Sequence, residues 1–323
     1  MCLQMVEINP CFFDTEAPSH ETYVISVSLY IIATVFGYAL NVYLIAVFIK
    51  GWKIHFSKDH FYRQSLESSI ASLLYLLSYA IVAIPYTVLN KPYLPQPALI
   101  FFASIRVFAF YLSIYLSLEV AIDRTLLFYD SIRYYLWTKL ELTRAIIIWS
   151  SAIITAVIPS SFGCYERFNP IGQYFTLKCS ICDITPILSF IHIFLAIGIF
   201  VPLATIFAYI LLIVKIRQME RSTSSQTRTR SSDINVVFQF GFICFFHLVS
   251  TFFFLPTFMP ANSLGIMATN VVMMTNAVTN PVVLLVFNSK VKQGCQTLFH
   301  RGSRTLTIRA RSSAKPDQKI HPT

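Results

Sequence analysis

The stretch VISVSLYIIATVFGYALNVYLIAVFI, residues 24–49, contains no charged side chain. A transmembrane helix needs about 20 consecutive, mostly apolar residues, because each residue adds about 1.5 Å to its length. The stretch therefore predicts a helix that crosses a membrane. The whole chain agrees with this: 55% of its residues are hydrophobic and 12% are charged, whereas soluble domains carry about 25% charged residues.

Six further apolar windows follow along the 323-residue chain. They cover residues 66–89, 98–122, 145–162, 187–214, 234–258 and 263–287. We find neither an internal repeat nor a large soluble domain between them. We therefore expect an all-α membrane protein, a bundle of seven transmembrane helices over residues 24–287, preceded by a short N-terminal segment at residues 1–23.

The positive charges of the loops predict how the bundle is oriented. If the N-terminus lies outside, the inner loops and the tail hold 21 Lys and Arg residues, and the outer loops hold 3. Lys and Arg are enriched on the cytoplasmic side of membrane proteins. We therefore expect an extracellular N-terminus and a cytoplasmic C-terminus. The net charge of +10 then faces the anionic inner leaflet, and no nucleic-acid partner is needed to explain it.

The segment after the last window predicts a short interfacial helix. Four residues of FNSKVKQGCQTLF, 287–299, recur at every fourth position: Phe287, Val291, Cys295 and Phe299. The lysines fall on other faces, as is typical of an amphipathic helix at a membrane surface. We expect this helix over residues 288–300 and a disordered cytoplasmic tail at 301–323. Cys295 is a candidate for palmitoylation, and a buried free thiol fits the pattern equally well.

Five of the seven cysteines fall in segments that we expect outside, where disulfides persist. They are Cys2, Cys11, Cys164, Cys179 and Cys182. Sequence spacing leaves their pairing open. Cys179-x-x-Cys182 has no second pair of ligands nearby, so we expect no metal site.

A charged pair ends the third window, in the stretch AIDRTLLFY at residues 121–129. Asp123 and Arg124 lie at the expected cytoplasmic end of the helix, where charge reaches the headgroup boundary. Taken alone, the pair fits a helix that ends in charge because it has reached water.

The surrounding residues carry a resemblance. The stretch SLEVAIDRTLLFYDSIRYY, 117–135, resembles the end of helix three and the second inner loop of rhodopsin-like G-protein-coupled receptors. Single residues in the other helices follow the same family pattern in order: Asn41, Trp149, Pro202, Pro256, Asn280 and Pro281. The resemblance thus extends over all seven helices.

Several positions depart from that pattern. Thr125 and Leu284 stand where tyrosines are usual, Ser72 replaces the helix-two aspartate, and Phe254 replaces the helix-six tryptophan. The start of helix three has no cysteine, so the usual bond to the second outer loop cannot form. Such divergence resembles the nematode serpentine chemoreceptors. The resemblance implies a chemosensory receptor in the plasma membrane, in a sensory cilium for some members, that takes a small-molecule ligand and couples to a heterotrimeric G protein.

The charged pair and the prolines predict a switch. A receptor needs two packings separated by a few kcal/mol, so that a ligand can favour one of them. Arg124, held by its neighbour Asp123 in one state, would be released to the G protein in the other. Prolines inside helices provide hinges, here Pro202, Pro256 and Pro281, with Asn280 beside the last. Static kinks are the alternative interpretation of these prolines.

Arg106 is a second charge within the third window. It precedes Arg124 by 18 residues, or five turns and about 27 Å, so both lie on one helix face. The small and hydroxyl residues Ser113, Ser117 and Ala121 on that face predict that it faces inward. An arginine inside a membrane is a candidate functional residue; the alternative is that it snorkels to the interface.

We expect Arg106 to line a ligand pocket together with three further residues: Phe110, His192 and Phe254. No acidic residue of the outer half of the spans can pair with Arg106, which predicts an anionic ligand, such as a small carboxylate. A lone His192 is also explained as a packed hydrogen-bonding residue.

Other classes of membrane protein fit less well. A transporter usually shows repeats and midplane carboxylates, and an enzyme with a metal centre needs grouped ligands. Residues 263–287 contain no lysine for a retinal Schiff base. We therefore expect neither an enzyme nor a cofactor, and we retain a transporter or a non-signalling seven-helix protein as the alternative.

Overall fold

The computed structural model describes residues 11, 17–57, 59–89, 93–169, 171–177, 180–222, 245–246, 248–249 and 263–296. Within this part of the chain, six helices are long and apolar enough to cross a membrane. They coincide with six of the seven predicted windows. The remaining window, 234–258, lies outside the described residues except for 245–246 and 248–249, which are helical.

The described elements follow one another in the order that the windows predict. The first two spans are α1 (His20–Gly51) with the π-helical turn η2 (Trp52–Phe56), and α2 (His60–Ser78) with the π-helical turn η3 (Tyr79–Ala83) and α3 (Ile84–Leu89). Next come α4 (Gln96–Tyr129), the short α5 (Ser131–Lys139) and α6 (Glu141–Ser161). The strands β1 (Arg167–Asn169) and β2 (Tyr174–Thr176) precede α7 (Phe190–Ser222) and α9 (Ser263–Phe287).

Side-chain caps explain where several helices begin. The Ser19 hydroxyl accepts a hydrogen bond from the backbone N–H of Thr22 at the start of α1. Asp59 does the same for Phe61 in α2, and Asp130 for two N–H groups of α5. Such caps satisfy donors that a helix leaves free in its first turn.

The π-helical turn η3 has a local cause in Pro85. Proline has no N–H, and its ring clashes with the carbonyl four residues earlier, which here belongs to Ile81. In η3 the backbone widens, and the N–H of Ile84 donates to the carbonyl of Tyr79, five residues back. The second span therefore continues as a helix past its proline.

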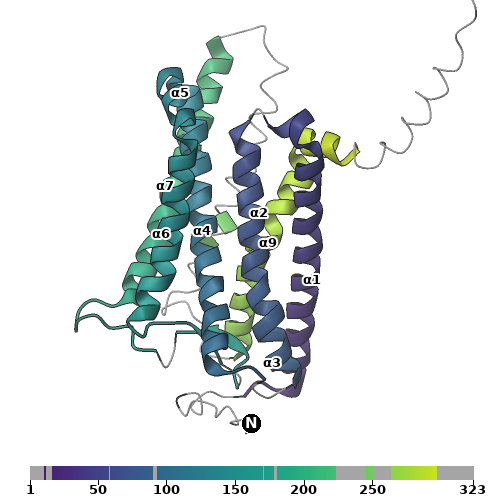
Figure 1. Ribbon diagram of the computed structural model, residues 1–323, viewed down its shortest axis with the longest axis vertical. Coiled ribbons are helices and arrows are strands. Elements are labelled where there is room, and N and C mark those ends of the chain that lie inside the picture. Colours follow the sequence, from purple (N-terminus) through teal and green to yellow (C-terminus); the bar gives the residue numbers. More distant parts are fainter. Residues whose placement is uncertain are drawn as a thin grey trace, which may run out of the picture.

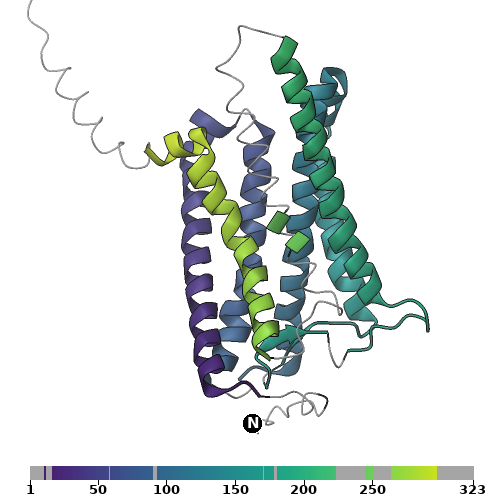
Figure 2. The ribbon, with the colours of Figure 1, turned by 180° about the vertical axis from the view of Figure 1, so that it is seen from behind.

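The helix α4 lies at the centre of the bundle and packs against α2, α6 and α7, whereas α1 packs against α2 and α9 (Figure 1). Seen from behind, α9 runs beside α1 (Figure 2). The two-stranded hairpin of β1 and β2 lies at one end, which we call the hairpin end, and α5 lies at the other, the α5 end.

The described residues continue helically at 289–296, beyond α9. The Asn288 side chain caps this segment by accepting from the N–H groups of Lys290 and Val291, both at 3.1 Å. Val291 is fully buried, and Cys295 packs against the same core. The predicted helix of residues 288–300 is thus helical over its described part, and residues 297–300 lie outside it.

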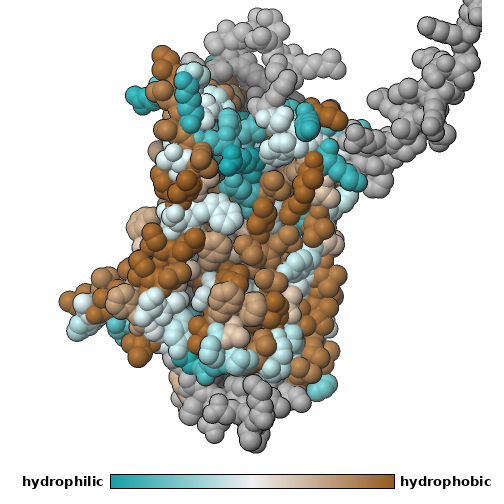
Figure 3. Space-filling view, in the orientation of Figure 1, coloured by the Kyte–Doolittle hydropathy of each residue, from teal (hydrophilic) through white to brown (hydrophobic). Residues whose placement is uncertain are grey.

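Apolar side chains cover the outside of the bundle as well as filling it. Several on α1, α6 and α7 are more than half exposed: Ile32, Val35, Phe36, Ile146, Ile147 and Phe207. On the face that Figure 3 shows, hydrophobic side chains form a broad band across the middle of the molecule. A soluble protein rarely exposes apolar surface of this extent, so the band is the lipid-facing surface of a membrane protein.

Candidate functional site

Arg106 of α4 lies inside the bundle at the hairpin end, and its side chain is 3% exposed. It therefore does not snorkel to the membrane surface. Its Nε donates to Oε2 of Glu166 at 2.8 Å, and its Nη2 donates to Oε1 of the same carboxylate. These two parallel bonds are the fork geometry in which arginine holds a carboxylate most firmly. Glu166 is equally buried.

This ion pair corrects one premise of the sequence analysis. We expected a guanidinium without an acidic partner, because we sought partners only among the spans. The partner is Glu166, 60 residues along the chain, in the segment between α6 and α7. A signal for it was present: a buried charge requires compensation, and Glu166 and Asp183 are the two acids in residues 163–189. The argument for an anionic ligand from an unpaired Arg106 was therefore wrong.

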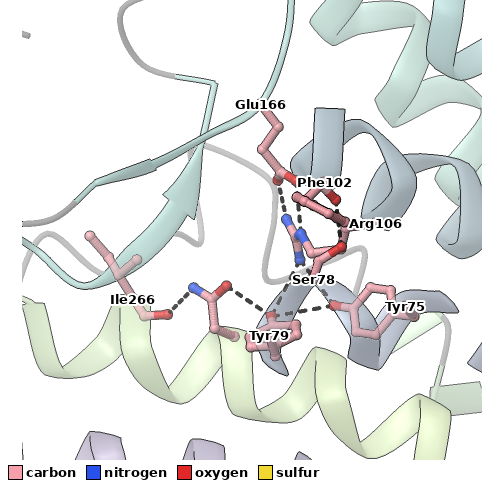
Figure 4. Close-up of polar contacts among 8 residues, drawn as sticks. Tyr75, Ser78, Tyr79, Phe102, Arg106, Glu166 and Ile266 are labelled. Atoms are coloured by element: carbon pink, nitrogen blue, oxygen red, sulfur yellow. Dashed lines mark hydrogen bonds and ion pairs between the residues drawn. The ribbon is translucent and has the colours of Figure 1, made fainter. Parts of the chain in front are cut away.

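Two tyrosines of the second span complete the surroundings of Arg106 (Figure 4). Its Nη1 donates to the hydroxyl of Tyr75 at 3.0 Å and to that of Tyr79 at 3.4 Å. Tyr79 in turn donates to Oδ1 of Asn270 in α9, at 3.3 Å. Hydrogen bonds thus connect α4, the second span, α9 and the segment that holds Glu166.

The hairpin of β1 and β2, which lies between α6 and α7 in the sequence, covers this network at the hairpin end of the bundle. The ring of Phe175 in β2 lies 4.5 Å from the guanidinium carbon of Arg106, in cation–π contact. Phe168 of β1 packs edge-to-face on Phe175, and both rings are buried. At the turn, the backbone carbonyl of Gln173 accepts from the hydroxyl of Tyr30 in α1. The hairpin is therefore inserted between helices.

A small cavity lies next to the network, toward the middle of the bundle. Its volume of about 20 Å³ is enough for a buried water and too small for an organic ligand. Residues of α2, α4 and α9 line it: Ala71, Ser72, Tyr75, Ala109, Phe110, Ser113, Met273, Asn276 and Ala277. Phe110, predicted as a pocket residue, thus faces a cavity, and Tyr75 belongs both to this lining and to the shell of Arg106.

A disulfide fixes the segment that carries Glu166. Cys164, three residues after the end of α6, is bonded to Cys182, and both lie in a buried cluster with Phe190 of α7. Cys11 is also disulfide-bonded. The sequence had left the pairing open, and Cys2 and Cys179 lie outside the described residues.

Arg124 lies on the same helix at the α5 end. Its Nη2 donates to Oδ1 of Asp59, the N-cap residue of α2, at 3.2 Å. The same carboxylate lies 3.8 Å from Nζ of Lys290, in the helical segment 289–296. The guanidinium carbon of Arg124 also lies 4.9 Å from the ring of Phe61. Asp59 thus joins three segments of the α5 end.

The neighbouring Asp123 does not hold Arg124 in this structure, which corrects the predicted pairing. It is 1% exposed, and within the described part of the chain neither of its oxygens has a hydrogen-bond partner. One turn earlier, Oε1 of Glu119 lies 3.0 Å from Nη1 of Arg144 in α6, and both side chains are 7% exposed. Sequence reasoning gave Glu119 no role; a buried interhelical pair is its role here.

Comparison with known protein families identifies the family of this chain. The family model of the serpentine type 7TM GPCR chemoreceptor Srx, a nematode family, matches residues 31–288. The chain belongs to this family. The resemblance drawn from the motifs is therefore confirmed, and so is the seven-helix fold class. No curated protein matches the chain.

The other site residues that the sequence predicts for this Srx receptor lie in α7, in α9 or outside the described residues. Asn280, next to Pro281 in α9, donates to the hydroxyl of Ser68 at 3.0 Å, which joins α9 to α2. Pro202 lies inside α7. His192 accepts a local hydrogen bond from the N–H of Ser189, and no contact among the described residues joins it to Arg106. Phe254 and Pro256 lie outside the described residues.

Proposed function

We propose that this Srx receptor is a chemosensory, G-protein-coupled receptor whose ligand binds in the hairpin-end half of the bundle and whose G protein binds at the α5 end. The observation that carries the proposal is the pair of buried arginines on α4, one at each end. Because α4 contacts α2, α6 and α7, a displacement at one arginine is transmitted by a rigid helix to the other.

The orientation belongs to the same proposal. The hairpin end carries the Cys164–Cys182 disulfide, and disulfides persist in oxidising compartments. The predicted inner loops and tail carry 21 of the basic residues, as expected for a cytoplasmic side. We therefore propose that the hairpin end faces outside, in a plasma membrane and, in a sensory neuron, on its cilium. A tag at residue 2 should then label on intact cells, and a tag at residue 320 only after permeabilisation.

The switch that we propose depends on Arg124. With Asp59 as its partner, the guanidinium is held against the start of α2. In the active state it leaves Asp59 and meets a G-protein peptide, while Pro202, Pro256 and Pro281 allow the three last transmembrane helices to bend.

Coupling is tested by Arg124→Ala with surface expression measured in parallel. Basal second-messenger level and the response to a panel of small organic compounds should both be lost, while surface expression stays near the parent level. Arg133→Ala is the matched control, because Arg133 lies at the same end and is 77% exposed. If Arg124→Ala signals like the parent, the arginine is only a helix-end charge and the coupling proposal is wrong.

A further inference from the structure

The surroundings of Arg106 are those of a carboxylate-binding site that is filled by the receptor itself. Two guanidinium nitrogens, Nε and Nη2, donate to the two oxygens of Glu166. The third nitrogen, Nη1, donates to the hydroxyls of Tyr75 and Tyr79. Each of the three guanidinium nitrogens therefore has a partner, and the Nε–Nη2 fork holds one carboxylate.

Glu166 reaches this site from a segment that is held at both ends. Two residues before it, Cys164 is bonded to Cys182, and directly after it begins β1. Among the ion pairs of the described residues, Arg106–Glu166 is the one that joins residues 162–189 to a helix. The contacts that hold the hairpin between the helices thus include one buried charge pair, the hydrogen bond from Tyr30 to the Gln173 carbonyl, and the apolar contacts of Phe168 and Phe175.

We propose that Glu166 is a tethered carboxylate ligand of Arg106, which closes the hairpin over the bundle and keeps external anions from the guanidinium. The receptor therefore contains a site for small monocarboxylates that opens only when Glu166 leaves. This inference rests on the proposed function only for the statement that the hairpin end faces outside. Its first test reads stability and not signalling, so the two proposals fail separately.

Removal of the Glu166 side chain should expose that site. Glu166→Ala leaves a buried guanidinium without its acid, which is strongly unfavourable, and it leaves room for the atoms removed. Acetate and propionate carry the same carboxylate on one or two carbons. They should occupy the vacated position and stabilise the folded variant by mass action, because they bind the folded state and not the unfolded state.

The first experiment measures thermal unfolding of the purified, full-length receptor in detergent. The Glu166→Ala variant is compared in sodium acetate, sodium propionate and sodium chloride at equal ionic strength, so that screening is the same. We expect the carboxylates to raise its unfolding temperature relative to chloride. The parent and the double variant Arg106→Ala/Glu166→Ala should show no such difference. Equal unfolding temperatures of Glu166→Ala in the three salts, or an equal rise in the double variant, would overturn the proposal.

The second experiment tests closure in the membrane and does not require a purified variant. Tyr174, which is 6% exposed in β2, is replaced by cysteine and labelled on intact cells with a membrane-impermeant maleimide. Glu166→Gln keeps the shape of the side chain and removes its charge. Added to Tyr174→Cys, it should raise the labelling rate by about tenfold, because a tenfold larger fraction of receptors would then have the hairpin displaced from the bundle.

The matched control for labelling is Glu119→Gln on the same Tyr174→Cys background. It removes the charge of Glu119, which lies on α4 like Arg106 and forms a buried pair with Arg144 of α6. This variant should leave the labelling rate unchanged. Background labelling of native cysteines is measured in the parent, and only surface-expressed protein is scored. Equal rates with and without Glu166→Gln, or equal increases from both glutamines, would show that Glu166 does not close the hairpin.

Discussion

The two arginines of α4 differ in how their charges are compensated. Arg106 and Glu166 are each 3% exposed and share two hydrogen bonds. Arg124 is 10% exposed, whereas its partner Asp59 is 30% exposed, offers one hydrogen bond of 3.2 Å and also lies near Lys290. One helix thus carries a dry, two-bond pair at the hairpin end and a partly solvated, shared pair at the α5 end.

This difference suggests which end of α4 is fixed and which is free to change partners. Charges interact more strongly where water is excluded, and removing one partner of a buried pair leaves an uncompensated charge. Pairs that water reaches contribute little and exchange readily. A receptor that responds to a ligand needs such an exchangeable contact on the side where its partner protein binds. Of the two pairs, Asp59–Arg124 is the one that water reaches, so we expect it to be the exchangeable contact.

The largest effect on stability is expected at the dry pair. Arg106→Ala should destabilise the fold by about 3–5 kcal/mol, because it leaves the Glu166 carboxylate buried without its counter-charge. The measurement is the thermal unfolding midpoint of the purified receptor. Arg106→Lys should recover part of the loss, since it retains the charge and loses the two-bond fork. An unchanged midpoint for Arg106→Ala would remove the distinction between the two ends.

A slightly smaller loss of stability is expected when the Glu119–Arg144 pair is broken. This pair tests whether burial, and not position along α4, determines the loss. This pair is nearly as buried as Arg106–Glu166, although it lies next to Arg124 on the helix. Glu119→Ala should cost about 3 kcal/mol, at the lower end of the range for broken buried pairs, because Arg144 retains the ring of Trp137 at 4.4 Å. A double-mutant cycle with Arg144→Ala measures the coupling; a coupling near zero would mean that the two charges do not depend on each other.

A change in signalling with little loss of stability is expected at Asp59. Asp59→Asn retains a good helix N-cap residue and removes the charge. It should cost about 1 kcal/mol or less, because the pair is partly solvated, and it should raise basal second-messenger production by freeing Arg124. Asp59→Ala is the matched variant that also loses the cap, at about 1 kcal/mol more. Basal signalling at or below the parent level in Asp59→Asn would contradict an exchangeable pair.

The smallest effect is expected at Lys290, whose side chain is half exposed and whose Nζ lies 3.8 Å from Asp59. Lys290→Ala should change the unfolding free energy by less than about 0.5 kcal/mol. The difference should shrink further in high salt, because exposed charges are screened. A loss as large as that of Arg106→Ala would show that the α5 end is as rigidly paired as the hairpin end.

The sequence predicted the spans well because hydropathy along a helix is a local property. Six windows fell on the described helices, and the inward orientation of Arg106 followed from helix periodicity together with the small and hydroxyl residues on the same face. The helices nevertheless extend beyond their windows: α4 continues to Tyr129, seven residues past the predicted end at 122. A helix continues as long as its hydrogen bonds do, which hydropathy does not report.

The charge partners were harder to predict because they depend on distant segments. Glu166 and Asp59 lie outside the apolar windows, 60 and 65 residues from the arginines that they bind. For Arg124 the sequence offered a neighbouring acid, Asp123, and adjacency in sequence was taken for contact. Consecutive residues of a helix point in directions about 100° apart, so i and i+1 do not face each other. The actual partner, Asp59, could have been considered from the sequence, because aspartate is a common N-cap residue and Asp59 lies shortly before the second predicted span.

The π-helical turn η3 affects how this receptor is compared with others residue by residue. A π turn closes its hydrogen bond over five residues instead of four, so η3 contains one residue more than an α-helical turn of the same rise. Beyond Ala83, a position number transferred from a receptor whose second helix is regular is therefore displaced by one, unless a gap is opened at residues 79–83. Without that gap, Tyr86, which is 5% exposed and packs against Phe168 of the hairpin, would be compared with a residue that points about 100° away from it on the helix.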